Sequence, residues 1–177
     1  MKYKLIPIVI LSIFTFLSCS SVTVNYDYDE EQDFSTYHTF KWLAKNKKNP
    51  PNAMKDPLAK RKTKNAVIKT LTAKGFSVQE KGEPDFYVIV HTGVRNRIDI
   101  SHWGYHYGPW YGPNTSVYRY KEGTIFIDII DGKKKELVWR GIGTGTVEPY
   151  YSPEERTEAI QEVVMEILEN FPPETAE

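Results

Sequence analysis

Two histidines four positions apart, His102 and His106, have the clearest spacing for metal chemistry. On a helix this spacing would place both imidazoles on one face, as a zinc site requires. Gly104 and Gly108 oppose a helix, no glutamate lies between the histidines, and no cysteine ligand is available. We expect neither a metal site nor another cofactor, and a zinc-binding module is kept as an alternative.

Carboxylates offer a second kind of chemistry, because glycoside hydrolysis uses two of them across the scissile bond. Asp128 with Glu122, or with Asp99, would make such a pair, but a chain with 23 acidic residues forms pairs by chance. The serine hydrolase pattern G-x-S-x-G and the phosphate-loop pattern are both absent. We expect no catalytic residue and no enzymatic activity. A hydrolase is the alternative, and it requires a cleft near Asp128 or His102.

Cys19 is the only cysteine of the chain, and it ends a secretory signal. Lys2 and Lys4 precede an apolar run, residues 5–17, which is shorter than the roughly 20 residues of a membrane-spanning helix. Residues 16–19, Phe-Leu-Ser-Cys, resemble the bacterial lipobox, with Phe16 where Leu, Val or Ile is usual. We expect cleavage before Cys19 and its acylation, which would give a durable anchor. An ordinary secretory signal with a chance cysteine is the alternative.

Residues 101–115 hold five aromatic side chains among three glycines and two prolines. The prolines and glycines exclude a regular helix and a central strand. Trp and Tyr rings stack on sugars, dock protein partners or lie at a membrane interface. Either the segment covers one end of a sheet with buried rings, or it binds an envelope protein or a glycan. The candidate contact residues are Trp103, Tyr105, Tyr107, Trp110 and Tyr111.

Residues 117–147 read as one β-hairpin around which the rest of the chain is arranged. Three isoleucines alternate along its first strand, which is typical of a half-buried strand, and Asp131-Gly132 predicts a turn with positive φ at the glycine. On the return strand, residues 136–147, we expect Leu137 and Trp139 on one face. Glycines at every second position share that face, so either a helix or the Trp139 ring packs on them, or they floor a shallow ligand groove.

The other predicted elements complete an α+β domain. An edge strand is expected at residues 22–26, followed by strands at 37–43, 76–79 and 85–100. A helix is expected over residues 58–74, with Gly75 after its C-terminus. A second helix begins at Ser152, where a capping box predicts its first turn, and its apolar stripe predicts docking on the sheet. Residues 44–57, between the strand at 37–43 and the first helix, are predicted to form a loop.

Charge is segregated along the chain. Residues 41–74 carry eleven Lys or Arg against one acid, Asp56, whereas residues 148–177 carry nine Glu against one base, Arg156. Two helices lying side by side would bring these opposite charges together. Alternatively, the basic segment faces anionic lipid headgroups. Nucleic acid is not expected as a partner of an exported domain.

Several short motifs together resemble the DUF4136 family of bacterial lipoproteins, over about residues 22 to 172. They are TYHTFKW at 36–42, KGF at 74–76, PDF at 84–86, EGTIFIDIID at 122–131, LVWRG at 137–141 and the closing helix with ENFPP. The resemblance implies export, a lipid anchor and an α+β fold, and it brings no catalytic residues. Its recurring positions here, structural as readily as functional, are Trp42, Asp85, Asp128, Trp139 and Gly141.

We therefore predict a signal peptide at residues 1–18, a lipidated tether at 19–21, one domain at 22–172 and a tail at 173–177. The domain is expected to be α+β, a mostly antiparallel sheet of about six strands with two helices packed on one face. The expected function is that of a non-enzymatic binding or structural module, anchored in the cell envelope. Ser20 after the cysteine fits sorting to the outer membrane, facing the periplasm. An envelope hydrolase acting on glycan or lipid is the alternative.

Overall fold

The structure, a computed structural model, describes residues 22–43, 56–102, 115–147 and 150–174, with backbone alone described for residues 98–102 and 115–120. The predicted loop at 44–57 falls mostly outside these residues. The chain forms, in order, β1 (Thr23–Tyr28), a short 3-10 helix (Phe34–Thr36), β2 (Thr39–Trp42), α1 (Pro57–Ala73), β3 (Ser77–Val78), β4 (Phe86–His102), β5 (Thr115–Asp131), β6 (Leu137–Val147) and α2 (Pro153–Glu169).

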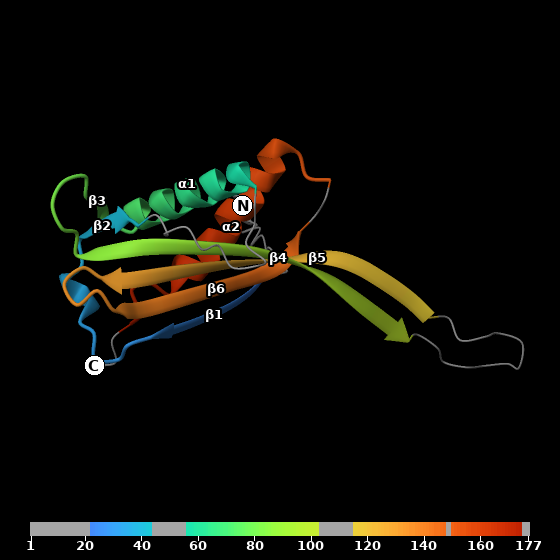
Figure 1. The fold of residues 1–177 in the computed structure, drawn as a ribbon, viewed down its shortest axis with the longest axis horizontal. Helices are drawn as coiled ribbons and strands as arrows, with labels where there is room; N and C mark the ends of the chain where they lie inside the picture. The colour runs from blue at the N-terminus through green and yellow to red at the C-terminus, as the bar shows by residue number, and fades with distance from the viewer. Residues whose placement is uncertain (1–21, 44–55, 103–114, 148–149, 175–177) are drawn as a thin grey trace, which may run out of the picture.

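The strands make one six-stranded sheet in the order β1-β6-β5-β4-β2-β3. The pairs β1–β6, β6–β5 and β5–β4 are antiparallel, and β2 runs parallel to both β3 and β4. Both helices lie on one side of the sheet (Figure 1). The predicted fold class, a mostly antiparallel sheet of about six strands with two helices on one face, is confirmed. Neither helix, within the described residues, is both long and apolar enough to cross a membrane.

Both helices begin where the sequence supplies a cap. Asp56 accepts hydrogen bonds from the amides of Leu58 (2.8 Å) and Ala59 (3.3 Å) at the start of α1. At the start of α2, Ser152 and Glu155 form the predicted capping box, with bonds of 3.1 and 2.7 Å. Gly75 follows α1 at φ +95°, a conformation that favours glycine.

The two helices run parallel and touch along their whole length. Near their first turns Arg156 lies 3.9 Å from Asp56, so the one base of the acidic segment meets the one acid of the basic segment. Further along, Gln161 donates to the hydroxyl of Thr70 (3.2 Å). At the last turns the Lys74 ammonium donates to the carbonyl of Glu169 (3.1 Å). The prediction of side-by-side helices is confirmed, and basic side chains of α1 make part of the contact.

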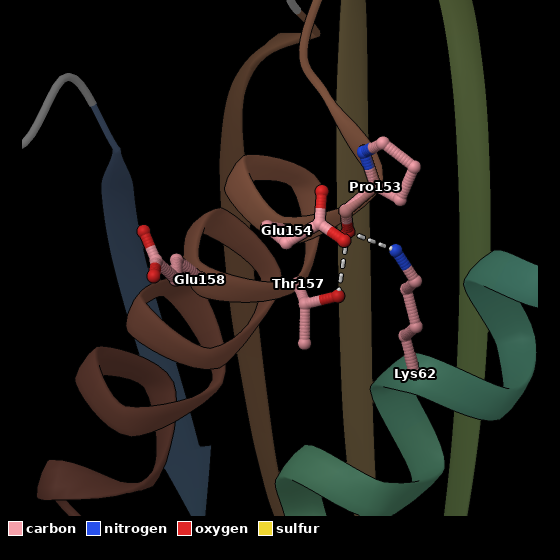
Figure 2. Close-up of a pocket in the computed structure, with 5 residues that line it drawn as sticks. All are labelled: Lys62, Pro153, Glu154, Thr157 and Glu158. Carbon is pink, nitrogen blue, oxygen red and sulfur yellow. Dashed lines mark hydrogen bonds between the residues drawn. The ribbon is translucent and has the colours of Figure 1, made fainter.

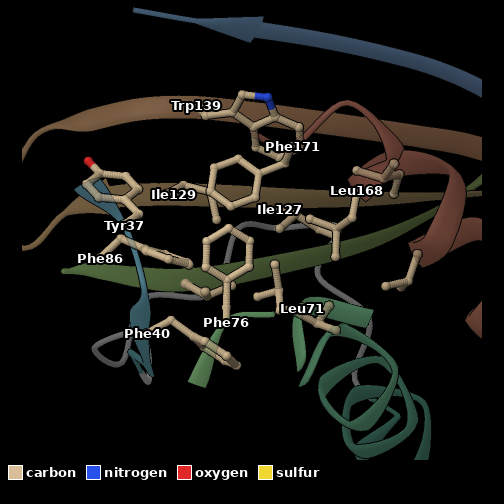
Figure 3. Packing of buried hydrophobic residues seen from close by; sticks show 14 of the residues in the cluster. Tyr37, Phe40, Leu71, Phe76, Phe86, Ile127, Ile129, Trp139, Leu168 and Phe171 are labelled. Carbon is tan, nitrogen blue, oxygen red and sulfur yellow. The ribbon is translucent and has the colours of Figure 1, made fainter. Parts of the chain in front are cut away.

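One aromatic cluster fills the space between the helices and the sheet (Figure 3). Phe171, which follows α2, is fully buried, and its ring lies 5.2 Å from Trp139 and 5.5 Å from Phe86. Phe76 and Phe34 pack on the same ring at 5.5 and 6.1 Å. Because the side chains come from both ends of the chain, the cluster joins the C-terminus to the sheet.

The predicted glycine track is confirmed as a packing surface for α2. A methyl group on Gly143 would lie 2.7 Å from Ile167, and one on Gly141 would collide with both Trp139 and Ile167. A helix and the Trp139 ring therefore both pack on these glycines, so the two predicted packing partners are present together. The groove interpretation is wrong for these two glycines, because protein atoms already occupy the space.

Two details of the hairpin differ from the prediction. The register of β5 and β6 shifts by one residue between Ile129 and Ile130, so Val138 is an extra residue. As a result Leu137 is exposed while Val138 and Trp139 are both buried, and Leu137 does not share the Trp139 face.

The turn also uses its glycine in another way. The positive φ, 62°, falls on Lys135 instead of Gly132. Gly132 is needed for space, because a Cβ there would collide with the carbonyl of Pro84 and lie 2.7 Å from that of Asp85.

Candidate functional site

The β4–β5 pair continues well beyond the rest of the sheet. β4 and β5 pair from Phe86–Asp131 to His102–Thr115, whereas β6 leaves β5 at the pair Lys121–Val147 and β2 leaves β4 near Val88. We call residues 95–102 and 115–122 the arm. It projects as a narrow ribbon away from both helices and from the aromatic cluster (Figure 1). The ends of the aromatic segment, His102 and Thr115, lie at its tip.

The five predicted contact residues fall outside the described part of the chain. These are Trp103, Tyr105, Tyr107, Trp110 and Tyr111, and His106 lies among them. What the described strands fix is the position of the two ends of this segment. Because the two ends lie at the tip of the arm, they are far from the aromatic cluster between the sheet and the helices.

The described side chains at the base of the arm are exposed and mostly basic. Arg95, Arg97 and Lys121 are exposed, and Arg97 donates to Glu122 across the strands at 3.1 Å. Isolated two-stranded ribbons are marginally stable in water. An exposed basic ribbon of this kind is therefore suited to contact another surface.

The helical arrangement considered for zinc does not form at His102, and His106, the other residue of the pair, lies outside the described residues. His102 lies in β4, where residues four apart are about 13 Å apart along the strand, so a helical pair cannot form at that residue. Within the described residues, no group of three or more His, Cys, Asp or Glu side chains is arranged around a metal position.

Asp128 is the most deeply buried carboxylate on the sheet face opposite the helices, which we call the helix-free face. Arg140 donates two hydrogen bonds to it, from Nε to Oδ1 at 2.7 Å and from Nη2 to Oδ2 at 2.8 Å. The Nε2 atom of His91 lies 3.5 Å from the second oxygen. The Asp128 side chain is 6% exposed and that of Arg140 is 42% exposed, so the guanidinium caps the carboxylate against solvent. Bidentate pairing of this kind fixes the orientation of the carboxylate and occupies both of its oxygens.

The carboxylate pairs considered for glycoside hydrolysis do not form. Glu122 is six residues from Asp128 on the same strand, about 20 Å away, and Asp99 is paired with Tyr118, further out on the arm. A hydrolytic pair needs about 5–9.5 Å. Asp128 is also occupied by Arg140, so the arrangement favours a structural role for this carboxylate.

Around this ion pair the helix-free face is apolar. Half-buried side chains surround Asp128 on the neighbouring strands, and no described element covers them. They are Tyr87, Ile89, Phe126, Ile130 and Ile142. Covering this face would remove apolar surface from water, so it is a second surface suited to contact.

Two further carboxylates organise the opposite end of the sheet. Asp131 accepts from the Tyr37 hydroxyl (2.7 Å) and from the amides of Lys133 (2.7 Å) and Lys134 (2.6 Å). Burial alone would raise the pKa of Asp131, but the hydrogen bonds from Lys134, Tyr37 and Lys133 outweigh it and hold the pKa below its usual value. Burial first, and the Asp131 contact second, raise the pKa of Tyr37.

Asp85 works in the same way on the neighbouring strand. It accepts from the amides of His38 (3.0 Å) and Thr39 (2.8 Å) and from the Thr39 hydroxyl (2.8 Å). Burial would raise the pKa of Asp85, but these bonds, that of the Thr39 hydroxyl first, lower it below its usual value. Asp85 therefore fixes the start of β2, which is a structural task.

A shallow depression lies between the first turns of the two helices (Figure 2). The Lys62 ammonium and the Thr157 hydroxyl both donate to the carbonyl of Pro153. Glu154 and Glu158 complete its lining. Lys62, the only cation that lines the depression, is already hydrogen-bonded to the protein.

Sequence reasoning missed Arg140 and Tyr37, the partners of the two buried carboxylates. A hairpin without a bulge would pair Asp128 with Trp139, so the extra residue Val138 hides the ion pair from a count along the strands. Tyr37 and Asp131 are far apart in sequence and meet only in the fold. The basic residues Arg95 and Lys121 of the arm could have been found from the sequence, since both lie in strand patterns among polar residues.

Comparisons with known proteins agree with this architecture. A family model described as "Domain of unknown function (DUF4136)" matches residues 24–173. No curated protein matches the chain. A PDZ domain protein from Parabacteroides distasonis has a similar structure, with a TM-score of 0.56 and 13% identity. The match covers 86% of this chain and only 36% of that protein.

A second solved structure, the PelC dodecamer from Paraburkholderia phytofirmans, has a TM-score of 0.47 and 12% identity. The match covers 83% of this chain and 94% of that one. At such identities the likeness to the first structure concerns the fold alone.

Proposed function

The chain belongs to the DUF4136 family, and we propose that it is a lipid-anchored module of the cell envelope that binds a partner through its arm. The module catalyses no reaction in this proposal. Cys19 carries the lipid, and the outer membrane, on its periplasmic side, is the proposed location because Ser20 follows the cysteine. The partner is an envelope protein, a glycan or the membrane itself.

The observation that carries the binding role is the position of the arm. The buried cluster takes its side chains from β2, β4, β5, β6 and the helices, and all of its members lie outside residues 95–122. The arm side chains that the structure describes, at residues 95–97 and 121–122, therefore add nothing to this core, yet the arm holds the ends of a segment with five aromatic residues far from it. A ribbon that costs backbone entropy without serving the core is suited to contact something outside the domain.

Support for the anchor comes from the sequence. Residues 16–19 resemble a lipobox, and the chain has no second cysteine with which Cys19 could form an intramolecular disulfide. Acyl chains on Cys19 would hold the domain at the membrane durably, because each buried methylene adds roughly 0.8 kcal/mol.

Mass spectrometry of the membrane fraction tests the anchor. The wild-type chain should give an N-terminal peptide that begins at an acylated Cys19. The Cys19→Ala variant should lose both the modification and membrane retention. A soluble, unmodified chain that begins elsewhere would contradict the anchor.

Capture from an envelope extract tests the arm. Trp103→Ala combined with Trp110→Ala should abolish partner capture while the circular dichroism spectrum and melting temperature stay unchanged. Tyr150→Ala is a matched control, since Tyr150 is an aromatic residue outside the arm that is 94% exposed. If capture persists in the double variant, or is lost equally in the control, the partner-binding role of the arm is contradicted.

A further inference from the structure

We propose that the anchored domain lies on its side against the bilayer, with the helix-free face and the arm toward the lipid headgroups. This inference rests on the proposed lipidation of Cys19. It names the bilayer surface as what covers the helix-free face.

The tether between the anchor and the domain is short. Only three residues separate Cys19 from Thr23, the first residue of β1, and the four Cα–Cα steps between them span at most about 14 Å when fully extended. Thr23 pairs with Thr144, which pairs with Thr124, which pairs with Gly93. These four residues therefore lie at one level of the sheet, and the bilayer surface lies within the tether length of that level.

Both ends of the sheet are farther from this level than the tether can reach. From Gly93 to His102 the arm extends about 30 Å, and from Thr124 to Asp131 the sheet extends about 23 Å the other way. If the domain stood upright with the arm toward the membrane, the arm would be driven deep into the bilayer. If it stood on the end of the sheet at Asp131, Cys19 would be held above the membrane surface. The strands must therefore run along the membrane.

The helix side is the wrong side to face the lipid. α2 lies over β6 and β1, the strand that follows the tether, and a helix layer adds about 15 Å to the sheet, which is more than the tether spans. α2 also carries six glutamates against Arg156 alone. The basic helix α1 contacts β3 at the far edge of the sheet, so the acidic helix would meet the membrane first. Anionic headgroups would repel it.

The helix-free side has the opposite character. Arg95 is exposed there, and so are Arg97 and the outer part of Arg140. Two acids on this face are paired within the domain, because Arg97 pairs with Glu122 and Arg140 pairs with Asp128, while a third, Asp27, lies exposed opposite Arg140 on β1. Between these groups lies the half-buried apolar patch around Asp128. Apolar surface flanked by bases matches the headgroup region of a bilayer with anionic lipid.

Site-specific fluorescence on the lipidated full chain tests this orientation. Since acylated Cys19 has no free thiol, one introduced cysteine can be labelled alone with an environment-insensitive dye. Asn25→Cys and Tyr26→Cys form a matched pair, adjacent on β1 and equally near the anchor. Their side chains lie on opposite faces of the strand, because the Tyr26 side shares the face of the buried Trp139. Arg95→Cys reports on the arm.

The labelled chains are reconstituted in vesicles of phosphatidylethanolamine and phosphatidylglycerol that carry a headgroup-linked nitroxide quencher. We expect the dyes at positions 25 and 95 to lose most of their fluorescence, and the dye at 26 to keep it. Equal quenching at 25 and 26, or stronger quenching at 26, would overturn the orientation while leaving the anchor intact.

Two other outcomes are distinguishable. If a second copy of the chain covers the helix-free face, dyes at 25 and 95 will escape the lipid quencher and transfer energy between copies, which overturns the proposal. If mass spectrometry of the same sample finds no acyl group on Cys19 and the chain does not float with the vesicles, the anchor and the orientation both fail.

Discussion

Asp128 and Arg140 differ in exposure, and that difference sets what each contributes. The carboxylate is 6% exposed and the guanidinium 42% exposed, so only the carboxylate depends on its partner for solvation. Removing one member of a buried pair leaves the other uncompensated, whereas a half-exposed charge can turn to water. The two possible single deletions should therefore have unequal costs.

We expect Arg140→Ala to lower the free energy of unfolding by about 3 kcal/mol and Asp128→Asn by about 1 kcal/mol. Urea denaturation followed by circular dichroism measures both values. The Nε2 atom of His91 lies 3.5 Å from Asp128 and partly offsets the loss of stability in Arg140→Ala. His91→Ala combined with Arg140→Ala should therefore lower the free energy of unfolding more than either change alone. Equal costs for the two single variants would contradict the argument.

Asp131 predicts how stability depends on acid. Its folded-state pKa lies below the ordinary value of 3.8, so its ionised form stabilises the native state above that pH. This contribution is lost as the pH falls from about 4 through the folded-state pKa, because the unfolded chain takes up the proton first. Asp131→Asn should therefore lower stability at neutral pH and flatten the loss of stability below pH 4, measured as urea midpoints across the acid range.

Tyr37 supplies the counterpart in base. Its pKa is raised above the ordinary 10.0, so the unfolded chain loses the phenol proton first and stability falls as the pH rises above about 10. Tyr37→Phe should remove this alkaline loss and leave Asp131 without one donor. An unchanged alkaline slope in that variant would show that another group controls it.

Helix α2 is positioned by the absence of side chains on β6. Gly143 faces Ile167, whose side chain is fully buried, at a distance that leaves no room for a methyl group. Gly143→Ala should cost about 1–3 kcal/mol, because overpacking forces the helix or the side chain to move. Ile167→Ala should cost about 2–4 kcal/mol through the cavity it leaves.

The double variant tests whether these two costs have one cause. Gly143→Ala in the Ile167→Ala background should cost almost nothing, since the new methyl group enters the space that Ile167 vacates. Thermal denaturation of the four chains gives the coupling, which we expect to be about 1–3 kcal/mol. Additive costs would mean that Gly143 is needed for another reason.

The elements themselves were largely predictable because their signals are local. The capping box at Ser152 predicts the start of α2, Gly75 marks the end of α1, and alternating isoleucines define β5, whereas the cap that Asp56 provides for α1 was not predicted. The bulge at Val138 was not predictable, since the alternation of Leu137 and Trp139 fits a regular strand equally well and only tertiary packing buries Val138 beside Trp139. The arm was missed for a related reason. Local pattern predicts that residues 85–100 are extended, but it does not tell where the neighbouring strands β6 and β2 end.

At the scale of the molecule, the core and the arm are separate structures joined by two continuous strands. The aromatic cluster around Phe171 lies against the part of the sheet that the helices cover, and the arm lies almost entirely beyond Lys121–Val147, the last pair of β5 with β6. Because free energy of folding comes mainly from buried apolar surface, the domain should fold without the arm. This separation can be tested on its own, whatever the arm contacts.

Arg95 and Glu122 face each other directly across the two strands, so a two-residue turn can connect them. Replacing residues 96–121 with Asn-Gly should leave the free energy of unfolding within about 1 kcal/mol of the parent value, measured by urea denaturation. If Cys19 is the anchor, the shortened chain should still float with vesicles, while capture of the partner is lost. A chain that fails to fold would mean that the arm is part of the folding unit and would remove the main argument for its role in contact.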